Sequence, residues 1–256
     1  MDINSLHKNN MIAIPQKEQG LAWLMANGPL VENPPLPMIM LRSLVADRRI
    51  LRLRRGLYLA PSTSGQMPSL PRAINLADPA GYISGHGALM LHNLNDQDIA
   101  RWYSVSTRRQ GDFHYGESLA HFVLSPSRTK VGLTMVEVRG EKIRLATVAR
   151  ALIDELDLMP FGLDLPETTR ILRLAVLSGM TTEQALIDEL RKTPSVAAGR
   201  RLGLLLEIIT GQQNPSLLAL AHSKSGVTRQ AGGIFVEPQW RLRLPQARTD
   251  ILRASR

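Results

Sequence analysis

One stretch of the chain, LRSLVADRRILRLRRGLYLAP at positions 41–61, constrains the fold more than any other. Its first half has apolar residues at positions i, i+3 and i+4, which are Leu41, Leu44 and Val45. This spacing predicts a helix over residues 38–48 with one face directed at a core. Arg42 and Arg49 are expected to lie together on another face of this helix.

The second half of the stretch changes to the periodicity of a strand. From Ile50 to Arg54 apolar and basic residues alternate, which predicts leucines on one side of a strand and arginines on the other. Arg55-Gly56 supplies a turn, and residues 57–59 predict a return strand. A short helix that leads into a basic hairpin is the outline of a winged helix-turn-helix.

The same stretch concentrates positive charge. The chain has 31 Lys and Arg against 22 Asp and Glu, a net charge of +9, which solubility alone explains as readily as an anionic partner does. Arginines on an edge strand can also simply prevent aggregation. A helix and its adjoining hairpin, however, can place cations on one surface that contacts DNA phosphates. The predicted DNA-binding residues are Arg42, Arg48, Arg49, Arg52, Arg54 and Arg55.

Composition and element order predict a soluble α+β protein with two domains. The 256 residues, of which 44% are hydrophobic, suffice for a sizeable core. The segment PSTSGQMPSLPR at 61–72 has the composition of a linker. We therefore predict a winged-helix domain with its linker at 1–72 and a mixed domain of short strands and helices at 73–256.

Outside the central stretch, turn and cap residues divide the chain into short elements. Before it, Pro15 begins a predicted helix that Gly28-Pro29 ends, and the prolines of Val31–Pro37 oppose another. After it, strands are expected at 102–107, 113–117, 121–125 and 235–244, with a hairpin at 134–145. Helices are expected to begin at Ser84, Thr147, Pro166, Thr181 and Ser195. Residues 212–230 are expected to form a loop.

The chain has no features of a secreted or membrane protein. It has no cysteine, which excludes disulfides and thiolate metal sites. The first residues lack the apolar core of a signal peptide, and no run approaches about 18 apolar residues. We therefore expect a cytoplasmic protein.

Titratable residues show no catalytic pattern. His86 and His92 are six residues apart, which does not place two metal ligands on one helix face, so both are interpreted as ordinary histidines. Asp154, Glu155 and Asp157 follow Arg150 on one predicted helix, which favours a solvated face with one ion pair. Phosphate-loop, nucleophile-elbow and zinc-protease motifs do not occur. We expect no enzymatic activity, no cofactor and no metal.

Four segments resemble the AbiEi-type antitoxin and transcriptional regulator family of type IV toxin–antitoxin systems. The resemblance covers nearly the whole chain, and its specificity comes from the order of the segments. These are the stretch at 41–61 with its R-G-x-Y hairpin, PAGYISGHGALMLHNL at 79–94, RLATVARALIDELDL at 144–158 and RRLGLLLEIITG at 200–211.

The resemblance implies an N-terminal DNA-binding domain and a C-terminal antitoxin domain. Such an antitoxin represses its own operon by binding repeats in the promoter. It also counteracts a nucleotidyltransferase-like toxin encoded next to it, without requiring a stable complex. Carried onto this chain, the DNA contacts fall on the six arginines named above.

One segment departs from the family pattern. The proline-rich Val31–Pro37 stands where a second helix is usual, and the next helix begins with the apolar run Leu36–Met40. Base edges are read mainly by polar side chains. We therefore expect binding mainly through the DNA backbone, or with the hairpin in a minor groove.

Two other functions are alternatives. One is a plain transcription regulator whose second half senses a ligand or dimerises. The other is a nuclease or nucleotidyl-transferring enzyme with a basic DNA-binding arm, which would need a cluster of acids around a divalent metal.

Overall fold

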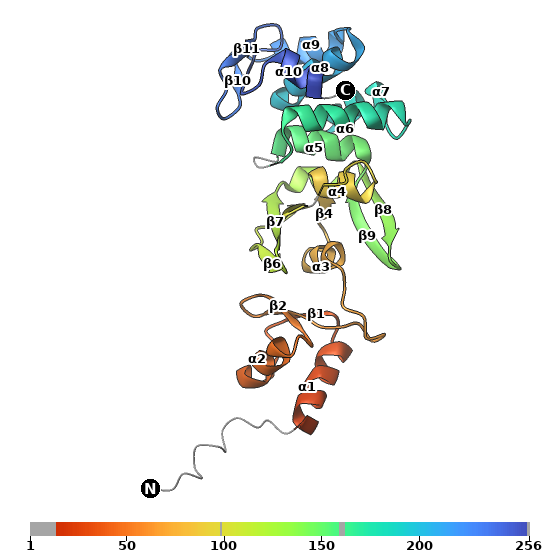
Figure 1. Ribbon diagram of the computed structural model, residues 1–256, viewed down its shortest axis with the longest axis vertical. Coiled ribbons are helices and arrows are strands. Elements are labelled where there is room, and N and C mark those ends of the chain that lie inside the picture. Colours follow the sequence, from red (N-terminus) through yellow and green to blue (C-terminus); the bar gives the residue numbers. More distant parts are fainter. Residues whose placement is uncertain (1–13, 98, 159–161, 255–256) are drawn as a thin grey trace.

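The computed structural model describes residues 14–97, 99–158 and 162–254. In this part the protein is a mixed α+β structure with ten α-helices, one short 3₁₀ helix and three β-sheets. The elements follow one another along an elongated molecule, with α1 and α2 near one end and α8–α10 near the other (Figure 1). The α+β class predicted from the sequence is confirmed.

The N-terminal unit is a small sheet with two helices on one face. Its elements are α1 (Ile14–Ala26), β1 (Leu30–Glu32), α2 (Met38–Ala46), β2 (Leu51–Arg54) and β3 (Leu57–Leu59). The sheet has the order β1-β3-β2 and is antiparallel throughout. Leu24, Leu44 and Tyr58 are buried in the core between helices and sheet. The predicted helices and hairpin are confirmed, whereas β1 was not predicted.

The other face of this small sheet packs against the rest of the protein. Leu53, Leu57 and Leu59 are buried in the large core that also contains the central sheet. Helix α3 (Leu70–Ala77) begins within the predicted linker and continues past residue 72. Its N-cap is Ser69, whose hydroxyl accepts a hydrogen bond from the Arg72 N–H. The division into two domains, at 1–72 and 73–256, stays a prediction.

A six-stranded mixed sheet forms the centre of the molecule. Its strands are β4 (Tyr82–Ser84), β5 (Arg101–Ser106), β6 (Phe113–Tyr115), β7 (Ser118–Leu124), β8 (Leu133–Val138) and β9 (Glu141–Ala146), in the order β6-β7-β5-β4-β9-β8. The pairs β5–β7 and β4–β9 are parallel, and the others are antiparallel. The strands and the hairpin expected between residues 102 and 145 are confirmed, with Gly140 at φ +77° in the hairpin turn.

Helices cover the sheet and continue to the C-terminal end. They are α4 (Gly85–Leu91), α5 (Val148–Leu158), α6 (Leu165–Leu177), α7 (Glu183–Lys192), α8 (Val196–Thr210), α9 (Pro215–His222) and α10 (Arg248–Ala254), with the 3₁₀ helix η2 (Pro126–Lys130) before β8. Within the described residues no helix is both long enough and apolar enough to cross a bilayer.

Three sequence predictions are wrong in this region. Helix α7 is capped by Thr182, one residue later than expected, because it is the Thr182 hydroxyl that accepts the Ala185 N–H. Part of the predicted loop 212–230 is helix α9, which Asn214 caps. The strand expected at 235–244 is divided into β11 (Phe235–Glu237) and β12 (Leu242–Leu244), which pair with each other and, through β12, with β10 (Thr228–Arg229).

The turn between β11 and β12 places a large aromatic side chain in the core. Trp240 is completely buried, and its indole N–H donates a 2.6 Å hydrogen bond to Glu207 of α8. The ring lies against Gly203, where an added Cβ would be 2.0 Å from an indole carbon. A side chain at this position therefore cannot be accommodated unless the indole or the helix moves.

We expect Gly203→Ala to lower the free energy of unfolding by about 1–3 kcal/mol, because overpacking outweighs the gain in helix propensity. The matched control is Gly20→Ala in α1, whose added Cβ meets the flexible end of the Met40 side chain. Urea denaturation of both variants measures the difference. Equal stability of the two variants would contradict the role of the Trp240 contact.

Candidate nucleic-acid interface

The arginines on and after α2 have exposed side chains. Arg42 lies on the helix itself, whereas Arg48 and Arg49 come after it ends at Ala46. Arg48 has φ +56°, and the hydrogen bonds from Arg48 N–H to Val45 O and from Arg49 N–H to Leu44 O end the helix with a left-handed residue. The expectation that Arg42 and Arg49 share a face of one helix is therefore wrong.

Arg49 forms an ion pair with Glu18 of α1. Its guanidinium donates two hydrogen bonds, of 3.0 and 3.2 Å, to the carboxylate of Glu18. The hydrogen bonds and the charge of Glu18 raise the pKa of Arg49 above its usual value. This exposed pair holds the end of α2 beside α1, and a DNA phosphate would have to compete with Glu18 for this cation.

A β-bulge in the hairpin separates the two arginines of β2. Arg52 lies opposite Tyr58, which faces the helices, whereas Arg54 lies opposite Leu57, which faces the large core. The Arg54 guanidinium donates a hydrogen bond to the carbonyl of Gly111 in the β5–β6 loop. The prediction that Arg52 and Arg54 lie on the same side of the strand is wrong, because the bulge shifts the register between them.

Four of the six predicted cations have no side-chain partner among the described residues. They are Arg42, Arg48, Arg52 and Arg55. All four are exposed and come from α2, the turn after it and the hairpin. Partner-free cations can take phosphate ligands without breaking an existing ion pair.

The start of α2 presents apolar rather than polar side chains. Met38 is 53% exposed and Ile39 is 50% exposed. Neither can form the bidentate hydrogen bonds that read base edges. The apolar start predicted for this helix is therefore exposed, and Arg42 follows Met38 one turn later on the same helix.

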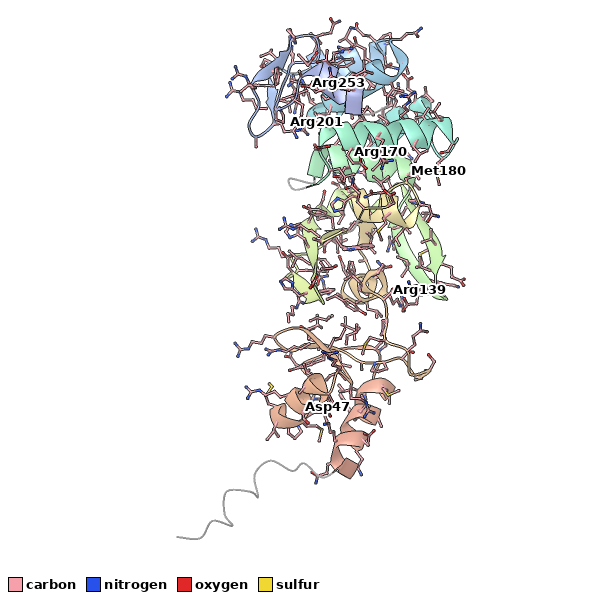
Figure 2. All side chains as sticks on the ribbon, viewed as in Figure 1. Asp47, Arg139, Arg170, Met180, Arg201 and Arg253 are labelled. Atoms are coloured by element: carbon pink, nitrogen blue, oxygen red, sulfur yellow. The ribbon has the colours of Figure 1, made fainter. Side chains whose placement is uncertain are left out.

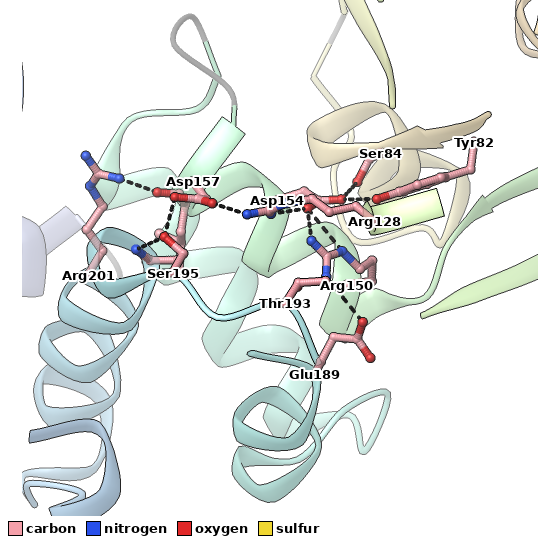
Figure 3. A network of polar contacts seen from close by, with 12 residues as sticks. Tyr82, Ser84, Arg128, Arg150, Asp154, Asp157, Glu189, Thr193, Ser195 and Arg201 are labelled. Atoms are coloured by element: carbon pink, nitrogen blue, oxygen red, sulfur yellow. Dashed lines mark hydrogen bonds and ion pairs between the residues drawn. The ribbon is translucent and has the colours of Figure 1, made fainter. Parts of the chain in front are cut away.

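The acids predicted to lie on a solvated face of α5 are instead buried, which is a correction. Asp154 is fully buried and receives hydrogen bonds from Tyr82 (2.8 Å) and Ser84 (2.7 Å) of β4. It also forms ion pairs with Arg128 of η2 and with Arg150, four residues before it. The predicted pair of Arg150 and Asp154 exists, but inside the protein (Figure 3).

The network continues from Asp154 into the later helices. Arg150 donates to Thr193 and contacts Glu189 of α7 at 3.4 Å. Arg128 also pairs with Asp157, which accepts a hydrogen bond from Ser195, the N-cap of α8. Burial lowers the pKa of Arg150, but Asp154 more than offsets this and the pKa is raised. Residues of β4, η2, α5, α7 and the cap of α8 are thereby joined.

His86 and His92 both contact neighbouring groups of the fold, which agrees with their interpretation as ordinary histidines. The His92 ring contacts the carbonyl of Ala146 at 2.8 Å. His86 is buried, with one ring nitrogen 2.7 Å from the carbonyl of Arg101 and the other 3.3 Å from Glu155. Burial lowers the pKa of His86, but the hydrogen bond to Glu155 and its charge outweigh this and raise the pKa. Among the described residues no cluster of three or more His, Cys, Asp or Glu could hold a metal ion.

Comparison of the chain with known protein families and with curated proteins finds no match. The interpretation of these sites therefore depends on the residues themselves.

We expect Asp154→Ala to lower the free energy of unfolding by about 3–5 kcal/mol, because it removes the buried carboxylate that the guanidiniums of Arg128 and Arg150 share. The control is Asp188→Ala, which removes an exposed pair with Arg191 on α7 and should cost less than about 1 kcal/mol. Chemical denaturation followed by circular dichroism compares the variants. Similar losses in both would show that the buried network adds no more than a surface pair.

Proposed function

We propose that this protein is a DNA-binding autorepressor and antitoxin whose N-terminal unit is a winged helix-turn-helix. The order α1-β1-α2-β2-β3, with β3 between β1 and β2 in the sheet, supports the winged-helix assignment. In this assignment α2 is the recognition helix and the β2–β3 hairpin is the wing. A proline-rich turn at residues 33–37 replaces the helix that usually precedes the recognition helix.

The observation that carries the proposal is the set of partner-free cations around α2 and the wing. Arg42 lies on the recognition helix, Arg48 follows its end, and Arg52 and Arg55 lie on the wing. Phosphates spaced along a duplex are bound by cations distributed in this way. The same proposal assigns Arg54 to holding the wing against the β5–β6 loop, since its guanidinium is bonded to Gly111.

The proposed mode of binding follows from the apolar tip of α2. Met38 and Ile39 can pack against thymine methyl groups or sugars but cannot form the polar contacts that distinguish base pairs. Affinity would come mainly from the backbone, and sequence preference from DNA shape. The antitoxin role is supported by the order of the four family-like segments, and its functional partner would be a nucleotidyltransferase-like toxin.

We expect the protein to bind duplex DNA from upstream of its own gene, with affinity that falls steeply as salt rises. Each phosphate neutralised should contribute about 0.9 to the slope of log K against log salt. Arg42→Ala combined with Arg52→Ala should therefore flatten the slope by up to about two units. Fluorescence anisotropy at several salt concentrations measures it.

The charge-matched control for this experiment is Arg191→Ala combined with Arg243→Ala, which removes two exposed arginines at the other end of the chain. This control should bind DNA as the unchanged protein does. If both double variants lost the same affinity, net charge rather than the α2–wing surface would explain binding.

We also expect repression and antitoxicity to be separable. In the full-length chain, the Arg42/Arg52 double variant should fail to repress the promoter but should still rescue growth when the neighbouring toxin is expressed from an unrelated promoter. The reason is that neutralisation would use residues beyond 72, which the substitutions leave unchanged. Growth assays and a promoter reporter measure the two activities. Absence of rescue by the unchanged protein under that promoter would favour a plain transcription regulator.

A further inference from the structure

A cavity far from the proposed DNA-binding surface is lined by two cations. Its volume is about 560 Å³, and it lies where the end of α5, the start of α6, the start of α8 and β10 meet. Arg201 of α8 and Arg229 of β10 line it. Figure 2 shows Arg201 in the C-terminal half of the molecule, well away from Asp47 beside the end of α2.

The two carboxylates in the wall of this cavity are already occupied. Both oxygens of Glu155 accept backbone N–H groups, those of His86 and Leu163. The oxygens of Asp157 accept hydrogen bonds from Arg128 and Ser195. Each of these oxygens therefore already accepts a hydrogen bond from a group other than the two cations.

The charges of the network balance without Arg201 and Arg229. Its three acids, Asp154, Asp157 and Glu189, are matched by three cations, Arg128, Arg150 and Lys192. Glu155 is paired with His86, whose pKa is raised. Within the described chain, the ion pairs of the network therefore do not include either arginine of the cavity.

Arg201 is only partly satisfied. Its guanidinium points from the first turns of α8 toward the end of α5 (Figure 3), where it donates to the carbonyl of Leu156. The described residues offer it no ion pair within 4 Å. Burial lowers the pKa of Arg201, and the charge of Asp157 only partly offsets this. Arg229 is exposed and has no side-chain partner in the described chain.

Gln230 also lines the cavity, and one atom of its amide has no partner among the described residues. Its Oε1 atom is buried and has no hydrogen-bond partner in the described structure. Buried polar atoms are normally hydrogen-bonded, so this one lacks an O–H or N–H group. If the amide turns toward the cavity, a singly protonated phosphate or a carboxylate that carries a hydroxyl can donate to it while its anionic oxygens face the arginines.

We propose that this cavity binds a small organic anion through a phosphate or carboxylate group held by Arg201 and Arg229. Guanidinium groups bind both kinds of oxyanion with paired, charge-assisted hydrogen bonds. The volume lies within the usual range for small-molecule sites, about 300–1,000 Å³. The site goes beyond the proposed DNA-binding function and does not depend on it, because it shares no residue with the α2–wing surface.

Isothermal titration of the full-length protein with inorganic phosphate, and separately with lactate, tests the site at constant ionic strength. We expect saturable binding of at least one of these two probes, and which probe binds identifies the oxyanion. Arg229→Gln should raise the dissociation constant at least about tenfold, because a charge-assisted hydrogen bond is lost. Arg229 is exposed, so the variant is expected to stay folded, which its melting curve verifies.

Two controls separate this site from general attraction of anions. Arg243→Gln removes an exposed arginine of the neighbouring β12, and Arg52→Ala removes a cation of the proposed DNA surface. Both should leave the dissociation constant unchanged. The proposal is overturned if neither probe binds saturably to the unchanged protein, or if Arg229→Gln binds as tightly as Arg243→Gln. Loss of binding in Arg52→Ala alone would place the anion at the DNA surface and overturn the cavity site while leaving the proposed function intact.

Discussion

The carboxylate of Asp154 carries a negative charge into the centre of the protein, and the surrounding elements are arranged to compensate it. Tyr82 and Ser84 supply neutral donors from the central sheet, and Arg128 and Arg150 supply cations from η2 and α5. A buried charge without compensating partners is strongly destabilising, so the elements that bear these partners must assemble together. The network thus fixes how β4, η2 and α5 meet, and through Arg150 and Arg128 it reaches the helices that follow.

This constraint explains why the sequence predicted the elements better than their environment. The helix around Arg150 and Asp154 was found from its periodicity, but the spacing of an ion pair is the same on a wet surface and in a core. This ion pair is buried because the sheet and the other helices cover α5. These covering contacts come from residues distant in sequence. The charged residues of α5 resemble the polar face of a surface helix, although Arg150, Asp154 and Glu155 are buried.

The basic hairpin illustrates a second limit of sequence patterns. Alternation correctly indicated the two strands and their turn, because it depends on the local period of two. A single bulge was enough to send Arg54 to the opposite face from Arg52, and no composition signal marks that bulge. The six candidate arginines therefore divide into four without a side-chain partner among the described residues, one paired with Glu18 and one hydrogen-bonded to Gly111. The cations of the C-terminal cavity were missed for the opposite reason, since Arg201 and Arg229 are distant in sequence and only the fold brings them to one space.

The hairpin has buried apolar side chains on both faces, with Tyr58 toward α1 and α2 and with Leu53, Leu57 and Leu59 toward the large core. Beyond it, residues 63–66 form an exposed loop, the kind of segment that proteases cut first. A cut there, followed by separation of the two products, would leave an uncovered apolar strip on each. Each fragment would then be prone to aggregation through this strip. One cut in this loop would therefore expose apolar surface on both parts of the protein.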